Sequence, residues 1–215
     1  MARPGRFTHP PGILRRMEVL SPEQWNDRYV TGDTPWDMRQ PSPPLVALLR
    51  SGKLPAGRVL IPGCGSGYEV ALLADAGFDV IGADYAESAI AVARQASPSA
   101  AERLRCVDLL ANDVAERIGT YDWAYDQTFF CAIEPSRRDE YAAAMARLIR
   151  VGGELIALSM RAMDPKGGPP YDSTPQDYLD LMSRHGFVET ERRTLTDESH
   201  PARRGRETLV RLRRV

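Results

Sequence analysis

A glycine-rich turn is the part of the sequence best suited to hold a small molecule. The apolar run 59–61 leads into P-G-C-G-S-G-Y at 62–68, with glycines at 63, 65 and 67. Glycines let a ligand approach the backbone closely, and the free N–H groups of a following helix attract a negative group. The spacing is G-x-G-x-G, whereas G-x-G-x-x-G is the pattern that grips a dinucleotide pyrophosphate. We therefore expect a nucleotide-like ligand here, the alternative being a turn that only tightens the chain.

Two acidic residues follow the turn at places where they could hold the rest of such a ligand. Asp84 lies 21 residues after Gly63 (84 minus 63), close to the offset of about 20 residues at which a carboxylate reaches ribose hydroxyls. Asp108 ends the next expected strand, where a carboxylate could accept from the amino group of adenine. Both have simpler alternatives, because Asp84 could cap the next helix and Asp108 could be an exposed loop residue.

The elements that must position these residues alternate between short apolar runs and helical segments. Strands are expected near 58–62, 79–83, 103–107, 121–126, 154–160, 187–192 and 207–213. Helices are expected near 68–76, 86–96, 111–118, 137–149 and 175–184, after two short N-terminal helices that begin behind Ser21 and Ser42. This alternation predicts an α/β fold with a doubly wound, largely parallel sheet. The last two strands, joined by a loop at 194–206, should form an antiparallel hairpin.

Composition limits the class of protein. The chain has 215 residues, of which 43% are hydrophobic and 27% charged, enough to fold as one domain, expected over 18–215 with a helical flap at 18–53. A net charge of −1 gives no field for nucleic acid or membrane, so we expect a small-molecule partner and no nucleic-acid or membrane partner. The protein is also expected to be a monomer. Three scattered cysteines predict a reduced, metal-free cytoplasmic protein. Residues 1–17 are expected to be a disordered leader, and Met17 is a possible alternative start.

Longer strings point to a family. The turn at 61–68, the aromatic segments W-N-D-R-Y at 25–29 and T-P-W-D at 34–37, and D-Q-T-F-F-C-A-I-E-P at 126–135 resemble the thiopurine S-methyltransferase family of class I S-adenosylmethionine-dependent methyltransferases. The segment G-G-P-P-Y at 167–171 is similar to a loop in its thiol, thiocyanate and halide branch. This resemblance implies a Rossmann-like seven-stranded fold with a terminal antiparallel hairpin and methyl transfer from S-adenosylmethionine to a thiol, thiocyanate or halide.

The resemblance also implies site residues. The residues expected to line the cofactor site are Trp25, Tyr29, Trp36, Gly63, Gly65, Gly67, Asp84, Tyr85, Asp108, Leu109 and Gln127. Three positions depart from the expected pattern: Ile61 stands where the class usually has an acid, Tyr29 where the branch often has Trp, and Gln127 where relatives carry Tyr or Arg. The change at Gln127 replaces an acid/base or cationic group by a neutral amide, which leaves the choice of acceptor open.

Methyl transfer to sulfur needs alignment and exclusion of water more than a catalytic triad. Gln127, Tyr171 and Asp37 are the candidate catalytic residues, and Asp172 is a further candidate helper. None lies in a recognisable base motif, which favours anionic or easily ionised acceptors. Trp25 and Trp36 could stabilise the sulfonium through their π faces, or they could simply pack the flap onto the sheet.

Other features have structural alternatives. The segment 167–171 could cover the substrate or merely connect a strand to a helix. Cys131 and His185 are expected to be a buried small residue and a helix-end residue. The arginines at 203–214 are expected on a solvated edge, with contact to an anionic substrate as the alternative. O- or N-methylation of a small metabolite, or cofactor sensing without turnover, are the other functions considered.

Overall fold

The computed structural model describes residues 20–161 and 167–215, so the expected leader at 1–17 lies outside the described residues. Within them one mixed sheet has the order β3-β2-β1-β4-β5-β7-β6. The strands are β1 (Val59–Pro62), β2 (Val80–Asp84), β3 (Leu104–Cys106), β4 (Tyr121–Gln127), β5 (Ile149–Met160), β6 (Phe187–Thr194) and β7 (Glu207–Arg214). β1 to β5 are parallel, and β7 is antiparallel to both β5 and β6. The doubly wound sheet and its terminal antiparallel hairpin are thereby confirmed.

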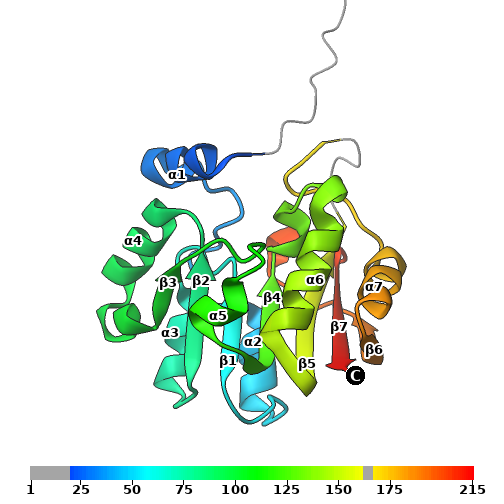
Figure 1. Cartoon of the computed structure of the whole chain (residues 1–215). Helices are drawn as coiled ribbons and strands as arrows, with labels where there is room; N and C mark the ends of the chain where they lie inside the picture. Colours follow the sequence, from blue (N-terminus) through cyan, green and yellow to red (C-terminus); the bar gives the residue numbers. More distant parts are fainter. Residues whose placement is uncertain (1–19, 162–166) are drawn as a thin grey trace, which may run out of the picture.

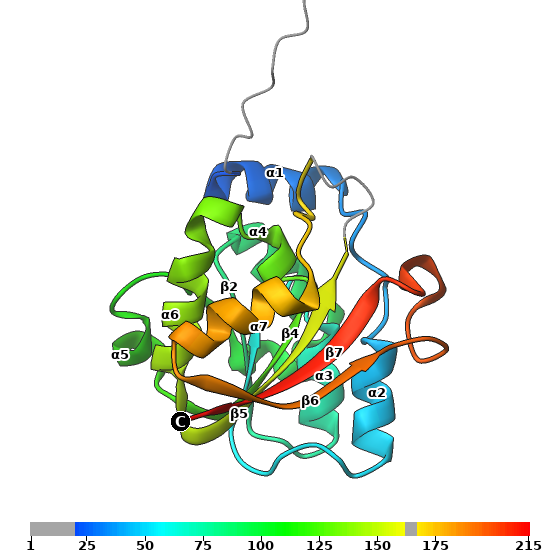
Figure 2. The ribbon, with the colours of Figure 1, turned by 90° about the vertical axis from the view of Figure 1, so that its right-hand side faces the viewer.

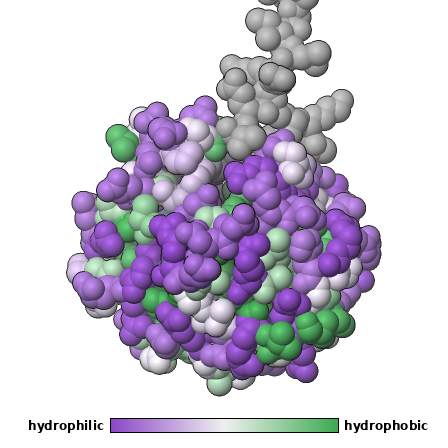
Figure 3. Space-filling model, in the orientation of Figure 1, coloured by the Kyte–Doolittle hydropathy of each residue, from purple (hydrophilic) through white to green (hydrophobic). Residues whose placement is uncertain are grey.

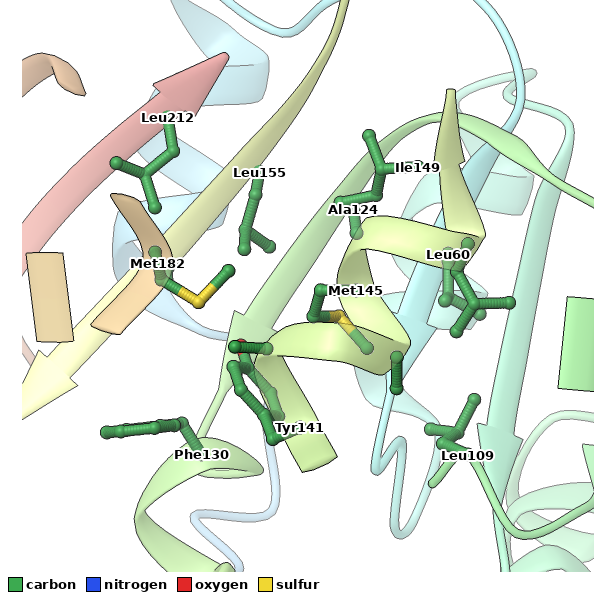
Figure 4. Packing of buried hydrophobic residues seen from close by; sticks show 14 of the residues in the cluster. Leu60, Leu109, Ala124, Phe130, Tyr141, Met145, Ile149, Leu155, Met182 and Leu212 are labelled. Carbon is green, nitrogen blue, oxygen red and sulfur yellow. The ribbon is translucent and has the colours of Figure 1, made fainter. Parts of the chain in front are cut away.

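Helices cover both faces of the sheet, as Figures 1 and 2 show. They are α1 (Pro22–Thr31), α2 (Pro43–Arg50), α3 (Tyr68–Asp75), α4 (Glu87–Ala96), α5 (Val114–Ile118), α6 (Arg138–Leu148) and α7 (Pro175–Arg184). One apolar cluster joins the sheet to α5, α6 and α7, and a second joins its other face to α2, α3 and α4. In the first cluster Phe130 lies beside Tyr141, with ring centroids 5.0 Å apart (Figure 4). This two-sided packing fixes the strand ends that carry the predicted site.

The first helix lies apart from these layers, at one end of the sheet and next to α4 (Figure 1). It begins with the expected capping box, in which the Ser21 hydroxyl accepts from the Gln24 N–H and the Gln24 side chain accepts from the Ser21 N–H. None of its ten residues is buried. The Asn26 side chain accepts hydrogen bonds from the backbone N–H and hydroxyl of Ser88, and these bonds tie α1 to α4. The helix is therefore a peripheral cover held by polar contacts.

Several boundaries differ from expectation. The helix expected from 111 begins at Val114, because the chain first turns, with the Ala111 N–H donating to the Asp108 carbonyl. β3 is only three residues long, because a 3₁₀ helix over Pro98–Arg103 takes up the preceding chain. β5 is longer than expected and begins directly at Ile149, where α6 ends. β3 ends one residue earlier than expected, at Cys106, and Asp108 and Leu109 still follow it into the cavity wall.

The surface is mostly hydrophilic. Figure 3 shows polar side chains over most of the visible face, with apolar side chains in small groups. In the described part of the chain, we find no helix with both the length and the apolar character needed to cross a membrane.

Candidate active site

A cavity of about 740 Å³ lies at the carboxyl ends of the parallel strands, within the size range of small-molecule sites. Twelve of the thirteen residues predicted for the site line it. They are Trp25, Tyr29, Trp36, Asp37, Gly63, Gly65, Asp84, Tyr85, Asp108, Leu109, Gln127 and Tyr171. The structure thus gathers residues from α1 and the segment that follows it, from four strand ends and from the loop after β5 around one space.

Gly67 is the predicted residue that does not line the cavity. Its φ of 77° is left-handed, and a Cβ there would lie 2.9 Å from the Cβ of Ala93 in α4. The turn can therefore lie close to α4 because Gly67 has no side chain. Gly65 instead faces the cavity, where a Cβ would lie 2.7 Å from the hydroxyl of Tyr29.

Asp84 ends β2 beneath the glycine turn. Its Oδ2 accepts from the Gly65 N–H at 3.1 Å and its Oδ1 from the Ala86 N–H at 2.9 Å. Burial raises the pKa of this carboxyl, and the backbone donors oppose that shift. The carboxylate therefore fixes the turn and the approach to α4, and its remaining lone pairs can accept from a ligand.

Aromatic side chains form the wall beneath α1. The Trp36 ring meets Trp25 at 5.2 Å and Tyr29 at 5.9 Å, in both cases edge to face. The guanidinium of Arg28 lies 5.7 Å from the Trp25 centroid and 5.2 Å from the Trp36 centroid. Burial, followed by the charge of Asp84, raises the pKa of the Tyr29 phenol, which stays neutral. These rings pack the flap together and also line the cavity, so the two sequence-based interpretations are compatible.

A buried polar network forms another part of the cavity wall. The donors and acceptors around Gln127 orient its amide so that the oxygen accepts from Arg203 Nη1 at 2.6 Å. Its nitrogen donates to Ser42 Oγ at 2.7 Å and to Glu69 Oε1 at 3.3 Å. Ser42 Oγ also lies 2.8 Å from the Tyr125 hydroxyl, which explains why it does not cap α2. The neutral amide thus joins a carboxylate to a cation.

Arg203 is the least expected member of this network. It is 5% exposed, donates to the Trp36 carbonyl at 2.6 Å and lies 3.6 Å from the buried Glu207 carboxylate. The expectation of a solvated edge is wrong for this arginine, because the 3₁₀ helix over Pro201–Arg203 places it in the cavity wall. Glu69 was also missed, although its place two residues after the glycine turn was a usable signal.

The other candidate catalytic residues are held by neighbours. Asp37 accepts from the Ser66 hydroxyl at 2.6 Å and from the Arg39 N–H at 2.7 Å. Tyr171 is 3% exposed, its N–H donates to the Cys131 carbonyl at 2.7 Å, and burial raises the pKa of its phenol. Asp172 pairs with Arg161 at 2.8 Å. These contacts fix the walls of the cavity.

Cys131 and His185 agree with the simpler interpretations. Cys131 is buried and donates to the Thr128 carbonyl, and burial raises the pKa of its thiol to about 12. The His185 ring lies 2.9 Å from Asp139 at the end of α7. Neither feature resembles an activated nucleophile or base.

The strand end beneath Gln127 carries a pH-sensitive carboxyl. Asp126 is 1% exposed and accepts from Tyr141 at 2.6 Å, and burial raises its pKa from 3.8 to about 6. A carboxyl whose pKa is raised in the folded protein stabilises the fold at low pH, and this stabilisation is lost as the pH rises through about 6. The shift from 3.8 to about 6 corresponds to about 3 kcal/mol of unfolding free energy.

The parent should lose this stability as the pH rises, whereas Asp126→Asn should not, because asparagine does not titrate. The unfolding free energy of Asp126→Asn minus that of the parent, measured by urea denaturation, should therefore rise by about 3 kcal/mol from pH 3.5 to pH 7. A difference that does not change with pH would contradict this prediction.

The fold and this cavity together define a class of protein. The strand order and the position of the cavity agree with the class I methyltransferase fold that the sequence predicts, and solved structures share this fold. A solved structure described as "Conversion of a Disulfide Bond into a Thioacetal Group during Echinomycin Biosynthesis" matches with a TM-score of 0.71 at 24% identity, covering 89% of this chain and 92% of the other. A TehB-like methyltransferase from Corynebacterium glutamicum matches with a TM-score of 0.63 at 18% identity, covering 90% and 98%. At these identities the likeness concerns the fold.

Sequence comparison identifies the family. The model for Thiopurine S-methyltransferase (TPMT) matches residues 20–214, and the chain belongs to this family. It is 35% identical over 175 residues to "Probable thiol methyltransferase 2" of Arabidopsis thaliana, covering 80% of this chain and 77% of that protein. It is 32% identical over 203 residues to "Thiocyanate methyltransferase 1" of Brassica oleracea, covering 92% and 88%.

Proposed function

We propose that this chain transfers the methyl group of S-adenosylmethionine to a small nucleophile, most favourably a thiol, thiocyanate or halide. The observation that carries the proposal is the combination, in one cavity, of a nucleoside-type site around Asp84 and a buried cation at Arg203. The first can hold the cofactor and the second attracts an anionic acceptor. The names of the thiol and thiocyanate methyltransferase relatives support the same acceptor class.

The residues present fit the cofactor. The glycine turn exposes backbone at Gly63 and Gly65, and Asp84 stands at the end of β2 with unused acceptor capacity for ribose hydroxyls. Asp108 and Leu109 offer an acceptor and an apolar surface for the base. When bound, S-adenosylmethionine supplies an electrophilic methyl group on a sulfonium.

The chain contributes position and shielding. Aromatic residues of the flap and Tyr171 of the loop after β5 exclude water from the space between the two subsites. Holding two reactants in line is worth up to about 7 to 11 kcal/mol of the barrier. Arg203, which lines the cavity and is oriented by the Gln127 oxygen, supplies a cation for an anionic acceptor without a proton transfer.

This proposal is tested by the formation of S-adenosylhomocysteine. The purified protein is offered thiocyanate, iodide, bisulfide, an aliphatic thiol, an aromatic thiol and a catechol in separate reactions. Turnover with the sulfur or halide acceptors is expected. Cofactor binding without turnover of any acceptor would contradict the proposal and favour a sensor.

One observation favours a second candidate, O- or N-methylation of a small metabolite. The chain is 29% identical over 162 residues to "2-heptyl-1-hydroxyquinolin-4(1H)-one methyltransferase" of Mycobacteroides abscessus, covering 72% of this chain and 69% of that protein. Turnover with the catechol alone would favour this alternative. The thiol and thiocyanate relatives are more similar, so sulfur is the first choice.

The proposed acceptor side also predicts a positioning role for Arg138, the first residue of α6. Its Nη2 donates to the Tyr171 and Asp172 carbonyls, each at 3.1 Å, and its guanidinium lies 4.7 Å from the Phe130 centroid. Arg138→Met should loosen the Tyr171 loop and raise the KM for thiocyanate about tenfold to a hundredfold. The cofactor Kd should not change.

Arg147→Met is the matched control for Arg138. Arg147 lies on the same helix, and the Nε atoms of Arg138 and Arg147 are both buried without a partner among the described residues. Neither arginine lines the cavity, and of the two it is Arg138 that donates to the Tyr171 and Asp172 carbonyls. We expect the acceptor KM of this variant to equal that of the parent. An equal rise in both variants would assign the effect to general destabilisation of α6.

A further inference from the structure

Glu69, the second residue of α3, places a carboxylate in the cavity wall beside Gln127. Its Oε1 accepts from the Ser42 N–H at 2.9 Å and from the Gln127 amide at 3.3 Å. Both of these hydrogen bonds reach Oε1, and the N–H of Glu69 itself also faces the carboxylate. The group is therefore held in one orientation mainly through Oε1, and the carboxylate keeps acceptor capacity at Oε2 for a proton.

The surroundings of Glu69 set its affinity for a proton. The charged groups that face it are the Arg203 guanidinium, which favours the carboxylate, and the Asp37 carboxylate, which opposes it. The titratable groups that feel its charge are Cys64, Tyr68 and Tyr125. Burial is the largest influence, and it raises the pKa of Glu69 above its usual value. A carboxylate with a raised pKa accepts a proton more readily near neutral pH.

Neutral thiols need such a group and preformed anions do not. An aliphatic thiol with a pKa of about 8.5 is mostly protonated at neutral pH, whereas thiocyanate and iodide are already anionic. Arg203, joined to Glu69 through Gln127, can stabilise the thiolate that forms. A carboxylate and a cation on either side of one amide thus suit removal of a proton and retention of the resulting anion.

We propose that Glu69 is the proton acceptor for neutral thiols, so that the acceptors of this enzyme include protonated aliphatic thiols. This inference rests on the proposed function and names a catalytic residue for it. The S–H bond breaks, the proton moves to Glu69 Oε2, and the electron pair stays on sulfur. That sulfur uses the pair to form a bond to the methyl carbon. The bond between the methyl carbon and the sulfonium breaks at the same time, and the electrons of this broken bond stay on the sulfur of S-adenosylhomocysteine. Glu69 then releases the proton to solvent.

The test compares two acceptors in one isosteric variant. Glu69→Gln keeps an oxygen for the Ser42 N–H and removes the proton-accepting carboxylate. At pH 7 we expect kcat/KM for an aliphatic thiol to fall about a hundredfold, within the range of general base catalysis. With thiocyanate the same quantity should stay within about threefold of the parent, because no proton is transferred. The deficit with the thiol should shrink as the pH approaches the pKa of the free thiol.

Glu87→Gln is the control variant. Glu87 occupies the first turn of α4 as Glu69 occupies the first turn of α3, but it is exposed and outside the cavity. It should leave turnover of both acceptors and the Tm unaffected.

Three results would overturn the inference, and they are distinguishable. Equal losses of kcat/KM with the thiol and with thiocyanate would show that Glu69 only positions the acceptor and does not accept its proton. A cofactor Kd that rises more than about tenfold in Glu69→Gln, measured by calorimetry, would make Glu69 a cofactor ligand. Absence of turnover by the parent with either acceptor would remove the proposed function and this inference with it.

Discussion

Replacing Asp84 by alanine is expected to weaken the binding of S-adenosylmethionine by about 1 to 3 kcal/mol, a factor of about 5 to 150 in Kd. The carboxylate is buried at the end of β2, where its two oxygens each accept one backbone N–H. If its remaining capacity accepts from ribose hydroxyls, the variant loses these bonds. It also loses the bond that holds the Gly65 N–H in place. Calorimetric titration with the cofactor measures the effect directly.

The matched variant Asp84→Asn separates the two contributions. An asparagine keeps one carbonyl oxygen that can accept from Gly65 but lacks the second acceptor and the charge. We expect its Kd to lie between those of the parent and Asp84→Ala. Parental affinity in Asp84→Ala would remove Asp84 from the cofactor site.

Replacing Arg203 by methionine should have the largest effect on stability, a loss of about 3 to 5 kcal/mol. Arg203 is the cation 3.6 Å from Glu207, and both side chains are almost fully buried. Its removal leaves the Glu207 carboxylate without a partner charge, and it also removes the hydrogen bonds to Trp36 and Gln127. Urea denaturation measures the loss, and a change below about 1 kcal/mol would contradict this assignment.

A paired substitution distinguishes stability from acceptor binding. Arg203→Met combined with Glu207→Gln removes both charges, so part of the lost unfolding free energy should return. Acceptor binding should not return, because the cation proposed to attract the anion is still absent. We therefore expect a raised KM for thiocyanate in both variants, and parental values in the double variant would exclude Arg203 from the acceptor site.

The sequence revealed the parts of the site whose positions follow from residues close to one another along the chain. The glycine turn and Asp84 each follow an apolar run, and parallel strands bring such ends to one edge of a sheet. Trp25 and Tyr29, four residues apart on α1, both reach the cavity. Gly67 shows the limit of the pattern, because a glycine motif does not tell which glycine meets the ligand and which meets a neighbouring helix.

The missed residues depend on long-range order. β7 runs antiparallel to β5 with Glu207 opposite Met160, so the start of β7 lies at the end of β5 that borders the cavity. This register places Arg203 in the site from a segment 76 residues after Gln127 (203 minus 127). A run of arginines alone does not reveal which of them becomes buried. Ser42 likewise has the sequence of a helix cap, yet its hydroxyl serves the network around Tyr125 and Gln127.

The most direct test of the proposed methyl transfer follows the methyl group itself. The purified protein is incubated with S-adenosylmethionine carrying a trideuterated methyl group and with either thiocyanate or an aliphatic thiol, and the products are identified by mass spectrometry. We predict methyl thiocyanate or the methyl thioether with the label on sulfur, together with unlabelled S-adenosylhomocysteine. Label recovered entirely in unreacted cofactor, while calorimetry shows that the cofactor binds, would contradict the proposed function.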